Sequence, residues 1–285
     1  MTRIFILGST GMIGHKLLHV LSKEDSYDVI GASRTKYNKD TVLTDVRDFK
    51  SIKKELDNIK PDIVINCCGL LIEDSEKNIF DAITINSLLP HYLSDLSISQ
   101  NYKFIHFSTD CVFSGQNGPY KEDDKKDAIS VYGKTKSLGE IIAENQLTIR
   151  TSVIGPDLFL DGGELLHWFL TQDGVVDGYT ESLWSGVTTL ELAKSVKWSI
   201  ENDKSGLRHL TSNKPISKYN LLKIINEHLN NKIKINKIDG PKHNKGLINS
   251  TNFYYDSDIS YQQIISEMFD DIKTNKHLYP HYKVG

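Results

Sequence analysis

The chain has 285 residues, 39% of them hydrophobic, and its 34 Lys and Arg against 37 Asp and Glu give a formal net charge of −3. This length and composition are typical of a globular protein of one or two domains with a large core. No basic run is long enough to follow a phosphate backbone, which excludes nucleic acid as an expected partner.

The cysteines and the apolar segments of the sequence disfavour a disulfide-rich, zinc-binding, secreted or membrane protein. Cys67, Cys68 and Cys111 are too few for a disulfide framework, and no Cys/His spacing resembles a zinc site. The N-terminal residues lack the apolar segment and cleavage site of a secretory signal, and no stretch approaches the roughly 18 apolar residues that span a membrane. We therefore expect a cytoplasmic protein with no metal and no membrane partner.

A nucleotide site is predicted near the N-terminus. Residues 3–7 form an apolar run typical of a buried parallel strand, and a helical pattern follows residue 14. Glycines at every third position between them let the backbone turn, approach a pyrophosphate and present helix N–H groups to it. A purely structural glycine turn is the alternative, which the flanking strand and helix disfavour. The loop residues expected to bind a dinucleotide are Gly8, Thr10, Gly11, Met12, Ile13 and Gly14.

The end of the second predicted strand, residues 27–32, indicates which cofactor is used. It is followed by Ser33 and Arg34, where an acidic residue would bind the adenosine 2′-hydroxyl and an arginine pairs with a 2′-phosphate. Ser33 and Arg34 are therefore expected to bind the cofactor, with NADPH preferred and NADH possible. The alternative is a solvated surface arginine without a ligand.

The next two strands extend the predicted cofactor site. Residues 41–46 should form a strand that carries Asp45 to the adenine amino group. After a helix at 49–59 and a strand at 62–65, the small residues 66–69 let a ring or ribose approach the backbone, so the nicotinamide side is expected there. Cys67 and Cys68 are interpreted as packing residues, because no flanking base that would make them nucleophiles is visible.

Residues 76–99 are typical of a helix that Pro90 should kink or divide. Asn86 lies on the apolar side of this helix, where a polar side chain needs a hydrogen-bond partner. It could bond the backbone of a neighbouring strand, or hold a water near a catalytic pair further along the chain. The purely structural role is slightly favoured.

The strongest candidate for chemistry is a tyrosine and a lysine four residues apart. A helix over residues 130–144 puts Tyr132 and Lys136 on one face, where the ammonium favours the phenolate and makes the hydroxyl a proton donor at neutral pH. A strand at 103–107 leads to Ser108 and Thr109, either of which could hold the same substrate oxygen. Reduction of a carbonyl by hydride needs a proton donor, a nearby cation and a hydroxyl of this kind. The alternative is that Tyr132 and Lys136 are only an exposed amphipathic pair with no catalytic role. A polar loop at 116–127 could cover the site.

Strands and helices alternate up to a sixth strand at residues 147–150, which predicts an α/β fold with a Rossmann-type doubly wound parallel sheet. We expect a cofactor-binding domain at residues 1–155 and a smaller C-terminal α/β substrate lobe at 156–285, with residues 187–201 returning to the first domain. The second half is predicted to contain helices at 164–171, 189–200 and 217–229, and a strand at 207–211.

Three motifs together resemble the extended short-chain dehydrogenases. They are Gly8-x-x-Gly11-x-x-Gly14, the run from Ser108 to Phe113, and the run from Tyr132 to Glu140. Within that group they are most similar to the dTDP-4-dehydrorhamnose reductase family, whose members reduce a nucleotide-linked 4-keto-6-deoxyhexose. The resemblance covers residues 1–155 and weakens beyond them.

The resemblance implies a role for each matching residue. Tyr132 would be the proton donor, Lys136 its pKa partner and a ribose ligand, and Thr109 the group that polarises the carbonyl. Cofactor contacts would come from Gly11, Met12 and Ile13 under the pyrophosphate, Asp45 and Val46 near adenine, and Cys67, Cys68 and Gly69 near the nicotinamide ribose. Gly69, Leu70, Thr109 and Asp110 would lie beside the sugar.

The chain departs from the family pattern in ways that affect the substrate. Cys111 and Val153 stand where many members have Tyr and Trp, and both changes remove aromatic surface near the sugar. His15 stands where members that dimerise through a metal have glutamate, so no such metal is expected. In the second lobe, Trp184 could stack on the substrate or equally be a buried core residue. Val153, Trp184 and Asn86 complete the expected substrate contacts.

The resulting hypothesis is an NADPH-dependent reductase of the C4 carbonyl of a nucleotide-linked 4-keto-6-deoxyhexose, acting in deoxysugar synthesis for surface polysaccharide. Residues 68–74 also look like a subgroup thought to act on UDP-linked 2-acetamido-2,6-dideoxy-4-ketohexoses. Two rival hypotheses are a sugar-nucleotide epimerase or dehydratase, and a non-catalytic nucleotide-binding regulatory subunit. The expected state is a monomer or a homodimer, with a nucleotide sugar as partner.

Overall fold

A computed structural model describes residues 1–160, 162–212, 214–254 and 258–284. They form two compact units, the first made of Met1–Phe113, Lys125–Arg150 and Val196–Arg208, and the second of Ser114–Asp124, Thr151–Ser195 and His209–Gly285. The chain therefore passes between the units several times. The division into a cofactor domain at 1–155 and a substrate lobe at 156–285 stays a prediction.

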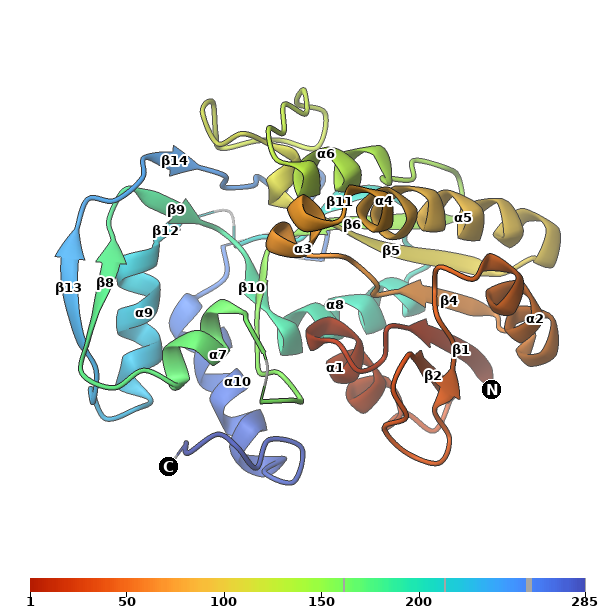
Figure 1. Cartoon of the computed structure of the whole chain (residues 1–285), viewed down its shortest axis with the longest axis horizontal. Coiled ribbons are helices and arrows are strands. Elements are labelled where there is room, and N and C mark those ends of the chain that lie inside the picture. The colour runs from red at the N-terminus through yellow and green to blue at the C-terminus, as the bar shows by residue number, and fades with distance from the viewer. Residues whose placement is uncertain (161, 213, 255–257, 285) are drawn as a thin grey trace. The chain divides into compact units, whose positions relative to one another are not determined.

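A seven-stranded sheet organises the first unit, with the strand order β11-β6-β5-β4-β1-β2-β3 (Figure 1). The pairs β1 with β2, β1 with β4, β2 with β3, and β4 with β5 are parallel. This order is that of doubly wound dinucleotide-binding folds, so the predicted α/β Rossmann-type class is confirmed. The strands are β1 (Thr2–Leu7), β2 (Tyr27–Ser33), β3 (Val42–Leu43), β4 (Ile63–Asn66), β5 (Lys103–Thr109), β6 (Gln146–Thr151) and β11 (Gly206–His209).

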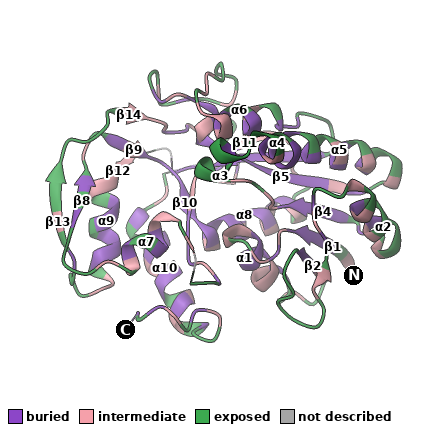
Figure 2. Ribbon diagram, in the orientation of Figure 1, coloured by how far each residue is buried: buried purple, intermediate pink, exposed green. Residues whose placement is uncertain are grey.

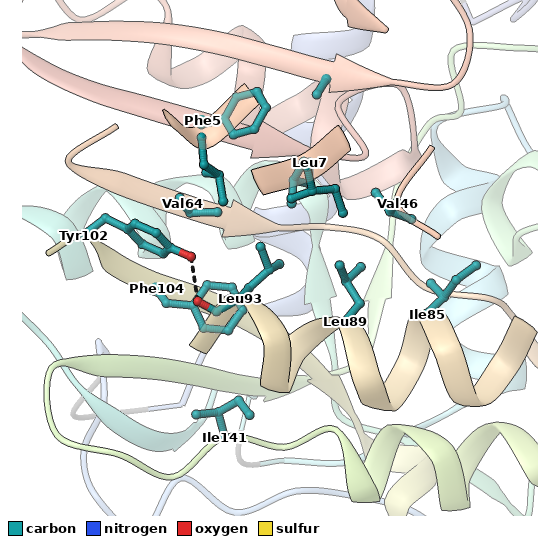
Figure 3. Packing of buried hydrophobic residues seen from close by; sticks show 13 residues of the cluster. Phe5, Leu7, Val46, Val64, Ile85, Leu89, Leu93, Tyr102, Phe104 and Ile141 are labelled. Carbon is teal, nitrogen blue, oxygen red and sulfur yellow. Dashed lines mark hydrogen bonds between the residues drawn. The ribbon is translucent and has the colours of Figure 1, made fainter. Parts of the chain in front are cut away.

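Helices cover both faces of this sheet. The helix α1 (Met12–Leu21) contacts β1 and β2, while α2 (Phe49–Ile59) and α5 (Leu89–Gln100) share one apolar cluster with the other face. Figure 3 shows that cluster, in which Phe5 and Leu7 of β1 pack near Leu89 and Leu93 of α5. The Tyr102 hydroxyl donates to the Leu93 carbonyl at 2.6 Å, which satisfies a polar atom within the cluster. Figure 2 shows β4 and β5 buried and much of α2 exposed.

The helix predicted at residues 76–99 is present from residue 79 onward, with a π-helical turn that the sequence did not predict. The chain forms α3 (Ile72–Lys77), α4 (Ile79–Ile83), a π-helical turn η1 (Thr84–Leu88) and then α5. The helical backbone is interrupted at Asn78, which has a φ of −136°, and then continues without a break from Ile79 to Gln100, so Pro90 lies in the first turn of α5 without dividing the helix. The wider π-helical turn, which contains Asn86, comes directly before it.

Two other predicted elements are shorter than expected. The helix α6 is Val131–Leu138 instead of 130–144, and Glu140, beyond its end, is bonded to Arg150. The third strand is only Val42–Leu43 instead of 41–46. Asp45 opens a turn in which its carbonyl accepts from the Asp48 N–H at 2.9 Å.

The second unit contains three small sheets, ordered β10-β7, β12-β9-β14 and β13-β8. Its helices α7 (Leu165–Leu170) and α9 (Lys218–Glu227) lie where helices were predicted, whereas α10 (Tyr261–Thr274) was not foreseen. Its strands are β7 (Val153–Ile154), β8 (Val175–Tyr179), β9 (Ser182–Trp184), β10 (Val187–Thr188), β12 (Ile216–Ser217), β13 (Lys234–Ile238) and β14 (His243–Asn244). The helix α8 (Thr189–Glu201) begins in this unit and ends in the first. Within the described ranges, no helix is long and apolar enough to cross a membrane.

Candidate active site

The glycine loop lies between β1 and α1, and two of its glycines are required by its geometry. Gly8 has a φ of +79°, and a Cβ on Gly14 would lie 2.1 Å from the Gly8 carbonyl oxygen. Gly11 is exposed, and a Cβ on it would have its nearest contact with the Gly8 carbonyl oxygen, at 3.5 Å, so its face of the loop is open. No side chain caps the start of α1. The loop therefore leaves room for an anion to approach the first turn of the helix, as a pyrophosphate would need.

The predicted adenosine contacts follow β2 and β3. Ser33 is buried and its hydroxyl donates to the Thr35 carbonyl, while Arg34 is exposed. Asp45 accepts from Arg47 at 2.6 Å, and this hydrogen bond lowers the pKa of the Asp45 carboxyl. All of these residues follow strands of one parallel sheet at their carboxyl ends, the edge where such folds bind nucleotides. The predicted contact Val46 differs from the rest, because it is buried in the apolar cluster.

The segment after β4 is held by backbone hydrogen bonds. The Cys67 N–H donates to the Leu7 carbonyl at 2.9 Å, and the Cys68 N–H donates to Asn66 Oδ1 at 3.0 Å. Burial raises the pKa of the Cys67 thiol well above its ordinary value and that of Cys68 to about 12. A thiol that keeps its proton is a poor nucleophile, which supports the interpretation of both as packing residues.

The helix α6 presents the tyrosine and lysine pair. Ser130 caps the helix by accepting from the Gly133 N–H at 3.1 Å, so Tyr132 and Lys136 lie one turn apart on the same face. Lys136 is 5% exposed and donates to the Phe107 carbonyl at 2.7 Å, whereas Tyr132 is half-buried. Burial lowers the pKa of Lys136 to about 8, with the nearby Glu140 carboxylate opposing the shift. The pair is thus a phenol beside a buried cation that still carries its charge at neutral pH.

Thr109 is the available hydroxyl at the end of β5. Its Oγ1 accepts from the Cys111 N–H at 3.1 Å and donates to Asp110 Oδ1 at 3.1 Å. Ser108, the alternative, donates to Glu140 Oε1 at 2.6 Å inside the core. A hydroxyl has one proton to give, and both bonds are buried, so turning the Thr109 hydroxyl from its longer 3.1 Å bond toward a substrate should cost less than breaking the 2.6 Å bond of Ser108.

The first turn of α6 packs against the short 3₁₀ turn η2 (Asp110–Val112) that follows Thr109. A Cβ on Gly133 would lie 2.2 Å from the Cys111 carbonyl oxygen, which shows how closely the two segments approach. Tyr132, next to Gly133, and Thr109, next to the 3₁₀ turn, are thereby carried by adjoining segments. The segments that carry the residues expected to act on a carbonyl therefore adjoin, and the roles of these residues stay predictions.

Asn86 bonds both the segment after β4 and α6. Its Oδ1 accepts from the Leu70 N–H at 2.8 Å, and its Nδ2 donates to the Leu70 carbonyl at 3.0 Å and to Thr135 Oγ1 at 3.1 Å. This is the backbone-bonding role expected from a polar side chain in apolar company. Gly69 is exposed beside it, so the Gly69 and Leu70 backbone is held next to the helix that carries Lys136. Substrate contacts by Gly69, Leu70, Asn86 or Asp110 stay predictions.

One buried group near the site had not been assigned a role from the sequence. The Glu140 carboxylate is bonded by Ser108, Arg150 and Lys126, and its side chain is 0% exposed. The sequence did contain a signal for this group, because Arg150 ends the predicted sixth strand and a charged residue in a buried strand must find a buried partner.

The remaining predicted contacts, Val153 and Trp184, belong to the second unit. Val153 is half-buried in β7, and Trp184 is 6% exposed, donates to Ser152 Oγ at 2.9 Å and packs against the Tyr261 ring at 5.7 Å. These contacts favour the core interpretation of Trp184, and its stacking on a sugar stays a prediction. In the part of the chain that the structure describes, no group of three or more His, Cys, Asp or Glu residues is arranged to hold a metal ion.

Fold and site together define a Rossmann-type α/β protein of the short-chain dehydrogenase class. Residues 1–156 match the family model described as the RmlD substrate binding domain, and the chain belongs to this family. The resemblance to dTDP-4-dehydrorhamnose reductases drawn from the motifs is thereby confirmed.

Comparison with individual proteins finds similar sequences and a similar fold among sugar-nucleotide reductases and polysaccharide biosynthesis proteins. The chain is 32% identical over 158 residues to the spore coat polysaccharide biosynthesis protein SpsK of Bacillus subtilis, covering 53% of each chain. It is 30% identical over 158 residues to a dTDP-4-dehydrorhamnose reductase of Aggregatibacter actinomycetemcomitans, covering 53% of this chain and 51% of the relative. The matches thus span about half the length of these relatives. The fold is similar to that of a Bacillus anthracis dTDP-4-dehydrorhamnose reductase in complex with NADP, with a TM-score of 0.82, 20% identity, and coverage of 95% and 100% of the two chains.

Proposed function

We propose that this protein reduces the C4 carbonyl of a nucleotide-linked 4-keto-6-deoxyhexose with NADPH. The observation that carries the proposal is the buried Lys136 one helical turn from Tyr132, on a helix that packs against the segment following Thr109. Membership in the RmlD family and the names of the relatives support the same activity. The open glycine loop and the exposed Arg34 fit a dinucleotide with a 2′-phosphate.

The chemistry assigned to the residues follows from their positions. NADPH, when bound, supplies the hydride that adds to the carbonyl carbon, and the carbonyl electron pair moves to oxygen. Tyr132 gives its proton to that oxygen as negative charge develops on it. Lys136 stabilises the resulting phenolate, and the Thr109 hydroxyl donates to the same oxygen. Lys136 keeps donors for a ribose hydroxyl, since Phe107 uses one of its three N–H groups.

The two units are assigned separate tasks in this proposal. The first holds the cofactor through Gly8, Thr10, Gly11, Met12, Ile13 and Gly14, with Ser33, Arg34, Asp45, Val46, Cys67, Cys68 and Gly69. The second contributes Val153 and Trp184 toward the nucleotide sugar. A UDP-linked 2-acetamido-2,6-dideoxy-4-ketohexose is the alternative substrate, because Cys111 and Val153 replace aromatic residues that would narrow the sugar site.

The test is to follow NADPH oxidation by the purified protein against dTDP- and UDP-linked 4-keto-6-deoxysugars. Tyr132→Phe should lower kcat by at least about 100-fold, the lower range for general acid catalysis, while the dissociation constant for NADPH stays within about twofold. Substantial turnover by Tyr132→Phe would remove the assigned proton donor. Product formation without net loss of NADPH would indicate an epimerase or dehydratase, and NADPH binding without turnover of any sugar would indicate a regulatory subunit.

A further inference from the structure

A buried ionic network lies directly behind the proposed catalytic residues. Glu140 Oε1 accepts from Ser108 Oγ at 2.6 Å and from Arg150 Nε at 2.8 Å, and Oε2 accepts from Arg150 Nη2 and Lys126 Nζ, both at 2.9 Å. The side chains of Glu140 and Arg150 are 0% and 1% exposed. The Arg150 guanidinium also lies over the Phe113 ring, 5.0 Å from its centroid.

Stability alone does not account for such a network. Removing two charges from water costs several kcal/mol, and apolar replacements of buried ion pairs are often neutral or stabilising. The network does connect the places where the proposed chemistry occurs. Ser108 directly precedes Thr109, and Glu140 follows Lys136 by four residues, just beyond the end of α6.

We propose that Glu140 is a positioning residue for the reduction, which fixes the end of β5 through Ser108 and maintains the positive charge of Lys136. This inference rests on the proposed function, because Glu140 has no role in the chemistry except through these two residues. It touches neither the cofactor nor the sugar in the proposed site. Four donors hold its carboxylate in place, so the negative charge has a fixed position relative to β5 and α6.

Among the titratable groups that act on Lys136, Glu140 has the largest effect on its pKa. Lys136 is influenced by Glu140, Cys67 and Cys68, and it acts in turn on His106 of β5. Burial raises the pKa of both thiols and lowers the pKa of His106 well below its ordinary value, so all three are neutral near pH 7. Hydrogen bonds from Arg150, Ser108 and Lys126 outweigh burial and lower the pKa of Glu140, which stays ionised. Of these groups, Glu140 therefore supplies the anion that favours protonated Lys136.

The charge-neutral substitution Glu140→Gln tests the inference. Activity requires protonated Lys136, so kcat should fall as the pH rises through the pKa of Lys136. Without the carboxylate that pKa is lower, and the falling limb of the profile should move about one unit toward acid, with kcat at pH 7.5 reduced about threefold. The dissociation constant for NADPH should change less than twofold. An unmoved limb in folded Glu140→Gln would overturn the inference.

A direct titration separates this inference from the proposed function. The Lys136 ammonium can be titrated by nuclear magnetic resonance in the full chain without substrate, so the result stands even if no sugar is reduced. Glu140→Gln should lower the measured pKa of Lys136, and Ser108→Ala, which retains the carboxylate, should leave it within a few tenths of a unit. Equal titration of Lys136 in Glu140→Gln and the unaltered chain would contradict the inference.

A milder variant covers the case in which Glu140→Gln does not fold. Lys126 lies at the partly exposed rim of the network, with its side chain 33% exposed, so Lys126→Met should be tolerated. Removing this competing cation strengthens the field of Glu140 at Lys136 and should raise the pKa of Lys136. The falling limb of the rate profile should then move toward alkaline pH. A shift in the opposite direction would count against Glu140 as the controlling charge.

Discussion

Arg34 is the residue on which the proposed cofactor preference depends. It is exposed and directly follows β2, the position next to which doubly wound dinucleotide-binding folds in general bind the adenosine ribose. Its position could be predicted from the sequence, because the strand before it is short, apolar and clearly bounded. Its contact with a 2′-phosphate is a proposal that a single substitution can examine.

Arg34→Ala should weaken NADPH binding by about 10- to 100-fold, since a hydrogen bond to a charged group contributes about 1.5–3 kcal/mol. NADH binding should change by less than about threefold, because NADH lacks the phosphate. Fluorescence titration with both cofactors measures this difference. Arg3→Ala is the matched control, since Arg3 is bonded to Asp28 at the amino end of β1. Equal losses for both cofactors would exclude a 2′-phosphate contact.

The sequence predicted which residues lie on a common face when those residues are close together in the chain. Tyr132 and Lys136 are one helical turn apart, so their common face follows from helix geometry. The sequence could not show that Glu140 reaches Ser108, because that bond joins positions separated by 32 residues through the tertiary fold. It also left two interpretations of Trp184 open, because an indole serves as either a core residue or a stacking surface.

The helix α6 illustrates what decides the length of an element. The pattern of residues 130–144 is compatible with a helix throughout, and yet α6 ends at Leu138. Close approach to the π-helical turn is the reason. The Ser87 hydroxyl donates to the Thr135 carbonyl at 2.7 Å, and a Cβ on Gly139 would lie 1.9 Å from the Asn86 carbonyl oxygen. Such backbone packing is not visible in hydrophobic periodicity.

Gly139→Ala should therefore destabilise the protein by about 1–3 kcal/mol, the usual cost of overpacking, because backbone is the obstacle and cannot rotate away. The activity should fall as well, since α6 carries Tyr132 and Lys136. Urea denaturation measures the first effect and steady-state kinetics the second. Gly163→Ala is the control, because a Cβ there meets no atom within 4 Å. Similar free energies of unfolding for the two variants would contradict the steric explanation.

At the scale of the whole molecule, the two units are interleaved along the chain. The first unit takes Val196–Arg208 from the second half of the sequence, and the second takes Ser114–Asp124 from the first half. The alternation of strands and helices predicted the doubly wound sheet, because each βαβ step is local. The seventh strand β11, which borders β6, comes from beyond residue 200 and was predicted as a strand without its neighbour.

A fragment of residues 1–155 should therefore not fold cooperatively. It lacks β11, so the edge of β6 would lose its partner, and an unpaired strand edge favours association with other chains. The expected result is a broad thermal transition and aggregation, whereas the full chain unfolds in a sharp transition. Circular dichroism and light scattering measure both. A fragment that unfolds as sharply as the full chain would show that the first unit does not need β11.

The position of β11 also bears on how the protein is made. A ribosome releases the glycine loop early, but the strand that completes the sheet emerges only after two of the three segments of the other unit have been synthesised. Until then β6 lacks its partner on one side, so chaperone binding during translation should be concentrated on partly made molecules, and termination after β6 but before β11 should yield insoluble products.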